Sequence, residues 1–326
     1  MDEKKEKKII TSIGGQALIE GILMRGPQKD AVALRDQKNG EIVKEFIHID
    51  SIKNKSNVFK LPFVRGIVGF IDSMRVGHKA LMLSANKYSE ETEDEPVEMS
   101  KFEKWLDDKL GDKMTVAITT LFTALGILLS IFLFFVVPVW IFNLMSSNFT
   151  FLQDSVIYRS VFEGIFRIVL FLLYIIICSQ MKEMRRVFQY HGAEHKTIFC
   201  YEAREELTVE NVKKFKRFHP RCGTSFIVLM LLVGIIIGLF IPATNPITRA
   251  VIKILLLPIM VGIGYELIKL CSRTENAITR IIAAPGLWMQ RITTKEPDDD
   301  MIEIAIAAMQ EVIPENGEDQ IQVAEK

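Results

Sequence analysis

Two histidines and a glutamate lie close together in the run His191-Gly192-Ala193-Glu194-His195. Residues four apart share one face of a helix, so a helical backbone points both imidazoles the same way, with a carboxylate beside them. In the H-x-x-E-H order two histidines bind zinc and the glutamate acts as a base toward water. The pattern predicts His191 and His195 as metal ligands and Glu194 as the catalytic base. The alternative is a pair of hydrogen-bonded surface imidazoles.

Further metal-binding side chains follow in His219-Pro220-Arg221-Cys222. Zinc takes three protein ligands and an open position in catalytic sites, and four protein ligands in structural sites. The two motif histidines with one further ligand would make an open site. The same histidines with both His219 and Cys222 would make a closed one. The sequence leaves both arrangements open, and it also offers three acids as the third ligand: Glu202, Glu205 and Glu206.

Long uncharged stretches place this chain among membrane proteins. It has 326 residues, of which 49% are hydrophobic, and a mean hydropathy of +0.23. Residues 114–153 carry no ionisable side chain, and about 20 apolar residues suffice to cross a hydrocarbon core. The predicted fold class is therefore mainly α, a polytopic membrane protein. Four transmembrane helices are expected in a membrane domain over 114–271, at about 115–142, 158–181, 224–241 and 250–271.

Lysine and arginine in the connections predict the orientation. The segment 182–223 carries ten of them, whereas 144–160 carries only Arg159. Such residues accumulate on the cytoplasmic side, so we expect 182–223 and both termini to be cytoplasmic in a cell-membrane protein. No apolar segment follows the charged start, so no cleavable signal is expected. If the second span continues as a helix, His191 stands about 15 Å beyond the membrane end.

The flanking segments predict cytoplasmic structure. A small mixed α/β domain is expected over 1–88, with a hairpin of strands 31–35 and 41–47 turning at Asn39-Gly40 and an amphipathic helix from Leu61 to Ser84. An acidic linker and lead-in helix should follow over 89–113. Helices are expected over 272–313, interrupted at Pro285-Gly286, with a disordered tail over 314–326.

Net charge and motif content limit the classes of binding partner. The formal net charge is zero, which gives no argument for nucleic acid as a partner. The glycine-rich segment Gly14-Gly15 lacks the Lys-Ser/Thr ending of a phosphate-binding loop. Thr208 is a suitable N-cap for a short helix with a basic face. Such a face favours binding of the helix to the anionic inner leaflet of the membrane. Membrane lipids are thus the expected partners, together with another membrane or cytoplasmic protein.

Four stretches of the chain carry a family resemblance. They are Gly14–Gly21 with Met24–Pro27, Tyr190–Lys196, His219–Ser225, and Ala284–Trp288 continuing to Asp299. In these motifs the chain resembles the bacterial YqhQ-like membrane protein family, a domain of unknown function and a predicted metal-dependent enzyme. The resemblance implies a bacterial multi-span membrane protein, and it implies that the glycine-rich N-terminal segment folds back beside the 182–223 connection.

Three functions from different classes fit these features. The first is a zinc-dependent hydrolase acting on a peptide, a lipid head group or another amide or ester near the membrane. The second is a non-enzymatic membrane assembly factor or scaffold with a structural metal site. The third is transport, which rests on charged residues in or beside the spans: Glu163, Arg167, Lys253 and Glu266. All four lie near predicted span ends, where snorkelling and a Glu163–Arg167 pair would accommodate them.

Overall fold

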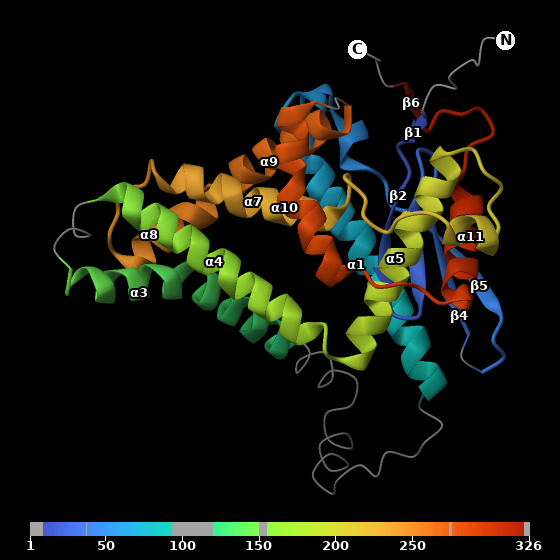
Figure 1. The fold of residues 1–326 in the computed structure, drawn as a ribbon, viewed down its shortest axis with the longest axis horizontal. Coiled ribbons are helices and arrows are strands. Elements are labelled where there is room, and N and C mark those ends of the chain that lie inside the picture. Colours follow the sequence, from blue (N-terminus) through green and yellow to red (C-terminus); the bar gives the residue numbers. More distant parts are fainter. Residues whose placement is uncertain (1–8, 37, 93–119, 150–154, 274–275, 323–326) are drawn as a thin grey trace, which may run out of the picture. The chain divides into compact units, whose positions relative to one another are not determined.

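A computed structural model of the chain describes residues 9–36, 38–92, 120–149, 155–273 and 276–322. The chain forms two compact units. The first unit comprises Met1–Glu91, Leu173–Met230 and Pro258–Lys326, and the second comprises Thr92–Leu172 and Leu231–Leu257. Most elements are helices, and the N-terminal part of the first unit forms a small antiparallel sheet (Figure 1). The expected mainly helical class with a small N-terminal sheet is confirmed.

Four strands build this sheet, each antiparallel to the next along the chain. They are β2 (Gly14–Leu18), β3 (Gly21–Arg25), β4 (Asp30–Arg35) and β5 (Ile42–Ile47). The last two form the predicted hairpin, in which Arg35 pairs with Ile42. Gly40 has a φ of +74° in the turn, a left-handed conformation that glycine adopts without steric cost.

Both faces of the sheet are covered by helices. Neighbouring residues of a strand point to opposite faces, so Ile22 joins one apolar cluster and Leu23 joins the other. Helix α1 (Val64–Thr92) packs on the face of Leu23. Helices α5 (Lys182–Glu202) and α11 (Asp299–Val312) pack on the opposite face (Figure 1). Because both faces are buried, the strand register is fixed, and so is the place of α5, which carries the histidines.

The C-terminal segment returns to the start of the chain. Strand β6 (Gln320–Gln322) pairs antiparallel with β1 (Ile9–Thr11). It lies within the segment 314–326 for which the sequence predicts disorder. The buried residue Asp319 anchors this strand, and composition alone does not show that Asp319 is buried. The Thr11 hydroxyl donates to the carboxylate of Asp319 at 2.6 Å, and Asp319 is fully buried.

Helix α10 (Ala277–Thr293) runs without interruption through Pro285, where the sequence predicts a break. Proline removes one backbone donor from a helix, but the glycine after it allows close helix packing. A Cβ on Gly286 would lie 2.7 Å from the Cα of Ser225 in α7 (Gly223–Gly238). Packing against α7 therefore offsets the missing hydrogen bond, and the predicted break does not form.

Two described helices are long and apolar enough to cross a membrane, Thr120–Ser146 and α4 (Val156–Cys178). The first contains a π-helical turn, η3 (Phe132–Val136), and ends in α3 (Val137–Ser146). A third candidate span is bent by 50° between its two helices, α8 (Pro246–Leu255) and α9 (Leu257–Arg273). The described residues thus contain two or three candidate spans, whereas the sequence predicts four.

Local chemistry explains these differences. Helix α7 has 16 residues, about 24 Å of helix against a hydrocarbon core of about 30 Å. The bend between α8 and α9 comes just before Pro258, whose ring clashes with the preceding turn. Helix α4 ends at Cys178, and α5 begins as a separate helix at Lys182. The second span therefore does not continue into the motif helix.

Short helices complete the described elements: η1 (Ile52–Lys55), η2 (Asn57–Lys60) and α6 (Val209–Lys213). Thr208 caps α6 as predicted, because its side chain accepts from the Asn211 N–H. The linker and lead-in were predicted over 89–113, but residues 89–92 belong to α1. Residues 93–113, and residues 115–119 of the first predicted span, lie outside the described residues.

Candidate metal centre

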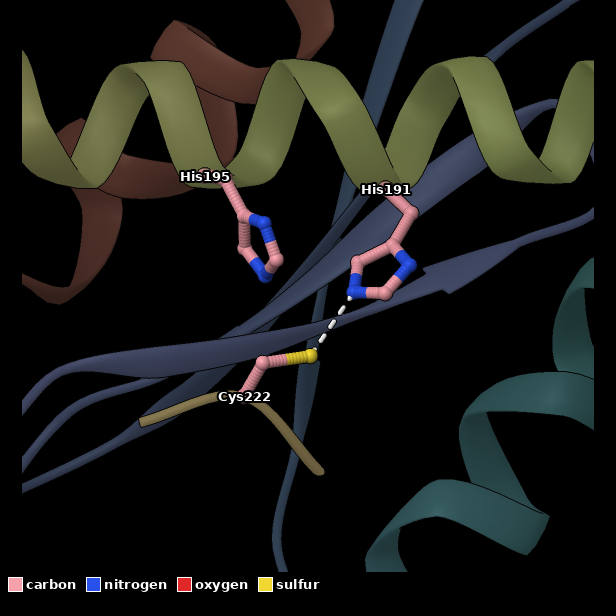
Figure 2. A group of neighbouring side chains, drawn as sticks. All are labelled: His191, His195 and Cys222. Carbon is pink, nitrogen blue, oxygen red and sulfur yellow. Dashed lines mark hydrogen bonds between the residues drawn. The ribbon is translucent and has the colours of Figure 1, made fainter. Parts of the chain in front are cut away.

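His191 and His195 lie one turn apart on α5 and project from the same side of the helix. Their ring centroids are 4.4 Å apart. Figure 2 shows both imidazoles pointing toward the sulfur of Cys222. The predicted helical spacing of the two histidines is therefore present, on a helix held firmly against the sheet.

Backbone carbonyls hold both imidazoles in one orientation. Nδ1 of His191 lies 2.8 Å from the carbonyl oxygen of Thr293, and Nδ1 of His195 lies 2.5 Å from that of Arg217. A carbonyl only accepts, so each Nδ1 carries the hydrogen and each Nε2 keeps its lone pair for another partner. Histidines that bind metals are commonly oriented in this way.

Nε2 of His195 is buried and has no hydrogen-bond partner among the residues that the structure describes. A buried acceptor without a partner costs about 1–3 kcal/mol, and the side chain is only 1% exposed. A cation bound at this nitrogen would remove that cost.

Cys222 supplies the third donor atom. Its Sγ lies 3.1 Å from Nε2 of His191, and the nitrogen, nitrogen and sulfur donors of the three residues all lie within 4.8 Å of one another. Zinc bonds of 2.0–2.3 Å place tetrahedral ligand atoms about 3.5 Å apart. Side-chain rotations that move the donor atoms by about an ångström would therefore bring all three within bonding distance of one ion. The Thr224 N–H donates to the sulfur at 3.4 Å, which suits a thiolate ligand.

His219 lies beside this group but outside it. Its ring centroid is 5.4 Å from that of His195, and its Nδ1 accepts the Arg221 N–H at 3.3 Å. Its Nε2 lies 3.1 Å from Nη2 of Arg221. Both ring nitrogens thus face Arg221. The structure brings His191, His195 and Cys222 together and leaves His219 apart.

The three acids proposed as alternative ligands are also outside the group. Glu202 accepts from the Thr11 N–H at 2.8 Å and pairs with Arg221. The side chains of Glu205 and Glu206 are exposed, and neither carboxylate belongs to the group. The described residues thus gather two imidazoles and one thiol, with no carboxylate among the three donors.

Glu194 is buried against strand β2. Its Oε1 accepts the backbone N–H of Gly15 at 3.0 Å. A Cβ on Gly15 would lie 2.9 Å from Cγ and Cδ of Glu194, so only glycine leaves room for this carboxylate. Burial raises the pKa of Glu194, while electrostatic attraction toward His191 and the Gly15 hydrogen bond oppose that rise. The contact confirms the expectation that the glycine-rich N-terminal segment folds back beside the 182–223 connection.

Comparison with known proteins agrees with the motifs. The family described as "Protein of unknown function (DUF1385)" matches residues 61–315. The chain belongs to the DUF1385 family. It is 35% identical over 311 residues to the "Uncharacterized protein YqhQ" of Bacillus subtilis (strain 168), covering 94% of this chain and 93% of that protein. No solved structure matches.

In this DUF1385 protein the loop before Cys222 is fixed by a residue that the sequence did not single out. Gln290 is fully buried, and its Oε1 accepts the His219 N–H at 2.7 Å. Its Nε2 donates to the His219 carbonyl at 2.7 Å and to the Ser225 hydroxyl at 3.0 Å. A glutamine 71 positions away in sequence gives no local signal, although it lies within the family match.

The segment from Thr293 to Lys295 packs against α5 in the DUF1385 chain. The Lys295 N–H donates to the Phe188 carbonyl at 2.8 Å. Gly192 lies directly against the Lys295 carbonyl, where a Cβ would not fit. The motif therefore needs glycine at position 192, because only glycine lets this segment approach α5 closely enough for the Thr293 carbonyl to reach His191.

An ion pair holds the same segment. Lys196 is 4% exposed, pairs with Glu296 and donates to the Lys213 carbonyl at 3.1 Å. Burial alone would raise the pKa of Glu296, but the hydrogen bonds and charges of Lys196 and Arg217 lower it below its usual value. The ionised carboxylate thus links α5 to the segment that follows Thr293 and to Arg217, the two residues whose carbonyls orient the imidazoles.

Proposed function

We propose that the chain is a membrane protein with a zinc-type site formed by His191, His195 and Cys222. The observation that carries the proposal is the buried Nε2 of His195, which has no partner in the described structure. Two imidazoles with oriented lone pairs and a thiol are borderline-soft donors, which suit Zn²⁺ better than Mg²⁺ or Ca²⁺. The residues present therefore fit such an ion.

We further propose that the site is open and hydrolytic. Three converging donors match the ligand number of catalytic zinc sites, and His219 is turned toward Arg221. A bound Zn²⁺ would supply Lewis-acid activation of water at neutral pH. Glu194 would act as the base, because Gly15 occupies Oε1 and leaves Oε2 to accept a proton.

The substrate class follows from the place of the ligands in the sequence. The apolar helix α4 ends at Cys178, shortly before the motif helix, and α7 begins at Gly223, directly after Cys222. A site at these points would act at the membrane face, on a peptide, a lipid head group or another amide or ester. A cytoplasmic location of 182–223 and of both termini remains part of this proposal, supported by the basic residues of 182–223.

One observation favours a non-enzymatic assembly factor instead. His195, Cys222 and Glu194 are 1%, 7% and 5% exposed, which leaves little room for a substrate. In this alternative the metal pins the loop between α5 and α7, and the cytoplasmic part of the chain recruits another protein.

Cobalt substitution separates the two functions without a known substrate. The full chain, loaded with Co²⁺, is titrated with acetohydroxamate while the visible absorption of the metal is recorded. An open site predicts a saturable spectral change, since hydroxamate takes the free coordination position. An unchanged spectrum would contradict the hydrolase and favour the scaffold. Glu194→Gln should keep the cobalt spectrum, because its carboxylate is outside the ligand group.

A further inference from the structure

The second unit holds an unbalanced set of buried charges. Among its described residues Glu163 is the one acid, against four cations: Arg159, Arg167, Arg249 and Lys253. All five side chains are buried, and none is more than 6% exposed. The helices that carry them are otherwise apolar and of membrane-spanning type. Isolated buried charges are costly, so an excess of buried cations needs a compensating anion.

Two of the cations share the single carboxylate. Nε of Arg249 donates to Glu163 at 3.0 Å, and Lys253 pairs with the same side chain. Arg249 also donates to the Gly238 carbonyl and the Ser160 hydroxyl, each at 3.1 Å. The sequence-based expectations of a Glu163–Arg167 pair and of a snorkelling Lys253 are therefore wrong. Most donors of Arg249 are therefore satisfied within the protein, and Arg249 holds the surrounding helices together.

Arg159 and Arg167 form no ion pair among the described residues, although Glu163 is close enough to attract both. Arg167 lies eleven residues from each end of α4 (Val156–Cys178), at mid-span rather than near an end. Its Nε donates to the Phe134 carbonyl at 2.8 Å, within the π-helical turn η3, and its guanidinium lies over the ring of Phe135. Its Nη2 is buried and has no partner in the described part of the chain. Lys253 is close enough to repel it.

A polar depression lies beside Arg159, the first of these cations along α4. It has a volume of about 470 Å³ and is lined by Asn143, Ser146, Ser147, Thr244, Asn245 and Pro246. Asn143 accepts from Nη1 of Arg159 at 2.6 Å, so the first cation lies directly behind the lining. Arg159, Glu163 and Arg167 follow at four-residue intervals along one face of α4, about 6 Å apart. Charged groups therefore extend from the depression to mid-span.

We propose that this cluster binds one phosphate-type oxyanion, held by Nη2 of Arg167 and the ammonium of Lys253. A guanidinium presents a planar fork of donors that matches phosphate oxygens, and lysine adds a point charge. The anion would offset the excess of buried cations among the described residues of the unit. Its source is free phosphate, because Arg167 lies at mid-span and lipid head groups lie at the membrane faces. All contributing residues belong to the second unit, so the proposal does not depend on the metal centre.

Melting temperature of the purified full chain tests the site. The protein is prepared in phosphate-free maltoside detergent, and its melting temperature is followed during addition of inorganic phosphate or, separately, phosphatidylglycerol. A saturable rise with inorganic phosphate supports the proposal, and a rise with the lipid alone contradicts the mid-span site. A saturable rise in neither titration would overturn the proposal.

Arginine variants make the test specific. Arg167→Gln should weaken binding about tenfold or more, because it removes a charged donor pair. Arg280→Gln, at an exposed arginine of α10, is the matched control and should bind like the wild type. If Arg167→Gln fails to fold, Arg167→Lys keeps the charge but loses the fork and should bind at least threefold more weakly. Unchanged binding in the folded Arg167 variant would contradict the assignment.

Discussion

The backbone N–H of Gly15 donates to Oε1 of Glu194 over 3.0 Å, which ties strand β2 to the motif helix. This single bond links residues 179 positions apart. It explains why the N-terminal segment and the His-Glu-His motif belong to one site: the strand backbone holds the carboxylate that the proposed chemistry requires.

Replacement of Gly15 by alanine should displace Glu194. The new Cβ would lie 2.7 Å from the Leu23 carbonyl oxygen and 2.9 Å from Cδ of Glu194, and such overpacking costs about 1–3 kcal/mol. We expect the free energy of unfolding in detergent to fall by that amount. Gly14→Ala is the matched control, because nothing lies within 4 Å of its Cβ position. Equal stability of the two variants would contradict this packing.

Gln290→Leu should loosen the loop that presents Cys222. The change removes the hydrogen bonds of Gln290 to the buried N–H and carbonyl of His219, at a cost of about 1–3 kcal/mol for each group. We expect a lower melting temperature and weaker zinc retention in dialysis. Gln28→Leu removes an exposed hydrogen bond to Glu318 and should change stability by less than about 0.5 kcal/mol.

The cysteines should differ in reactivity, measured by iodoacetamide labelling and peptide mass spectrometry. Burial, aided by the charge of Glu205, raises the pKa of Cys200 to about 11. The thiol is therefore protonated at pH 8 and should react slowly until the pH approaches that value. Zinc should slow the labelling of Cys222 and leave that of Cys178 unchanged. Fast labelling of Cys200 at pH 8 would show that it is not buried as described.

Metal removal should destabilise the wild-type chain. A ligand that binds only the folded state adds about 2.7 kcal/mol at 100 times its dissociation constant. A chelator should therefore lower the melting temperature of the wild type by several degrees. His195→Ala lacks one ligand and should show no such shift. A chelator effect of equal size in this variant would place the metal elsewhere.

The sequence predicted the parts of the structure that depend on local periodicity. The β4–β5 hairpin, helix α1 and the shared face of His191 and His195 follow from turn residues and from spacing along the chain. The membrane-type helices follow from uncharged length. These features depend on residues within one element, so a single sequence suffices to find them.

Features set by distant contacts could not be predicted. The sequence offered His219 and Cys222 equally as ligands, and the loop conformation fixed by Gln290 and Arg221 separates them. The continuity of α10 through Pro285 depends on its packing against Ser225. The mid-span place of Arg167 became visible only once the bounds of α4 were known.

Zinc content of the purified full chain, measured by mass spectrometry with inductively coupled plasma, tests the central claim most directly. We predict one zinc per chain in the wild type, loss of zinc in His191→Ala and in His195→Ala, and retained zinc in His219→Ala, because His219 faces Arg221. Zinc absent from the wild type, or unchanged in both motif variants, would contradict the metal centre. Loss of zinc in His219→Ala as well would contradict the open three-ligand site.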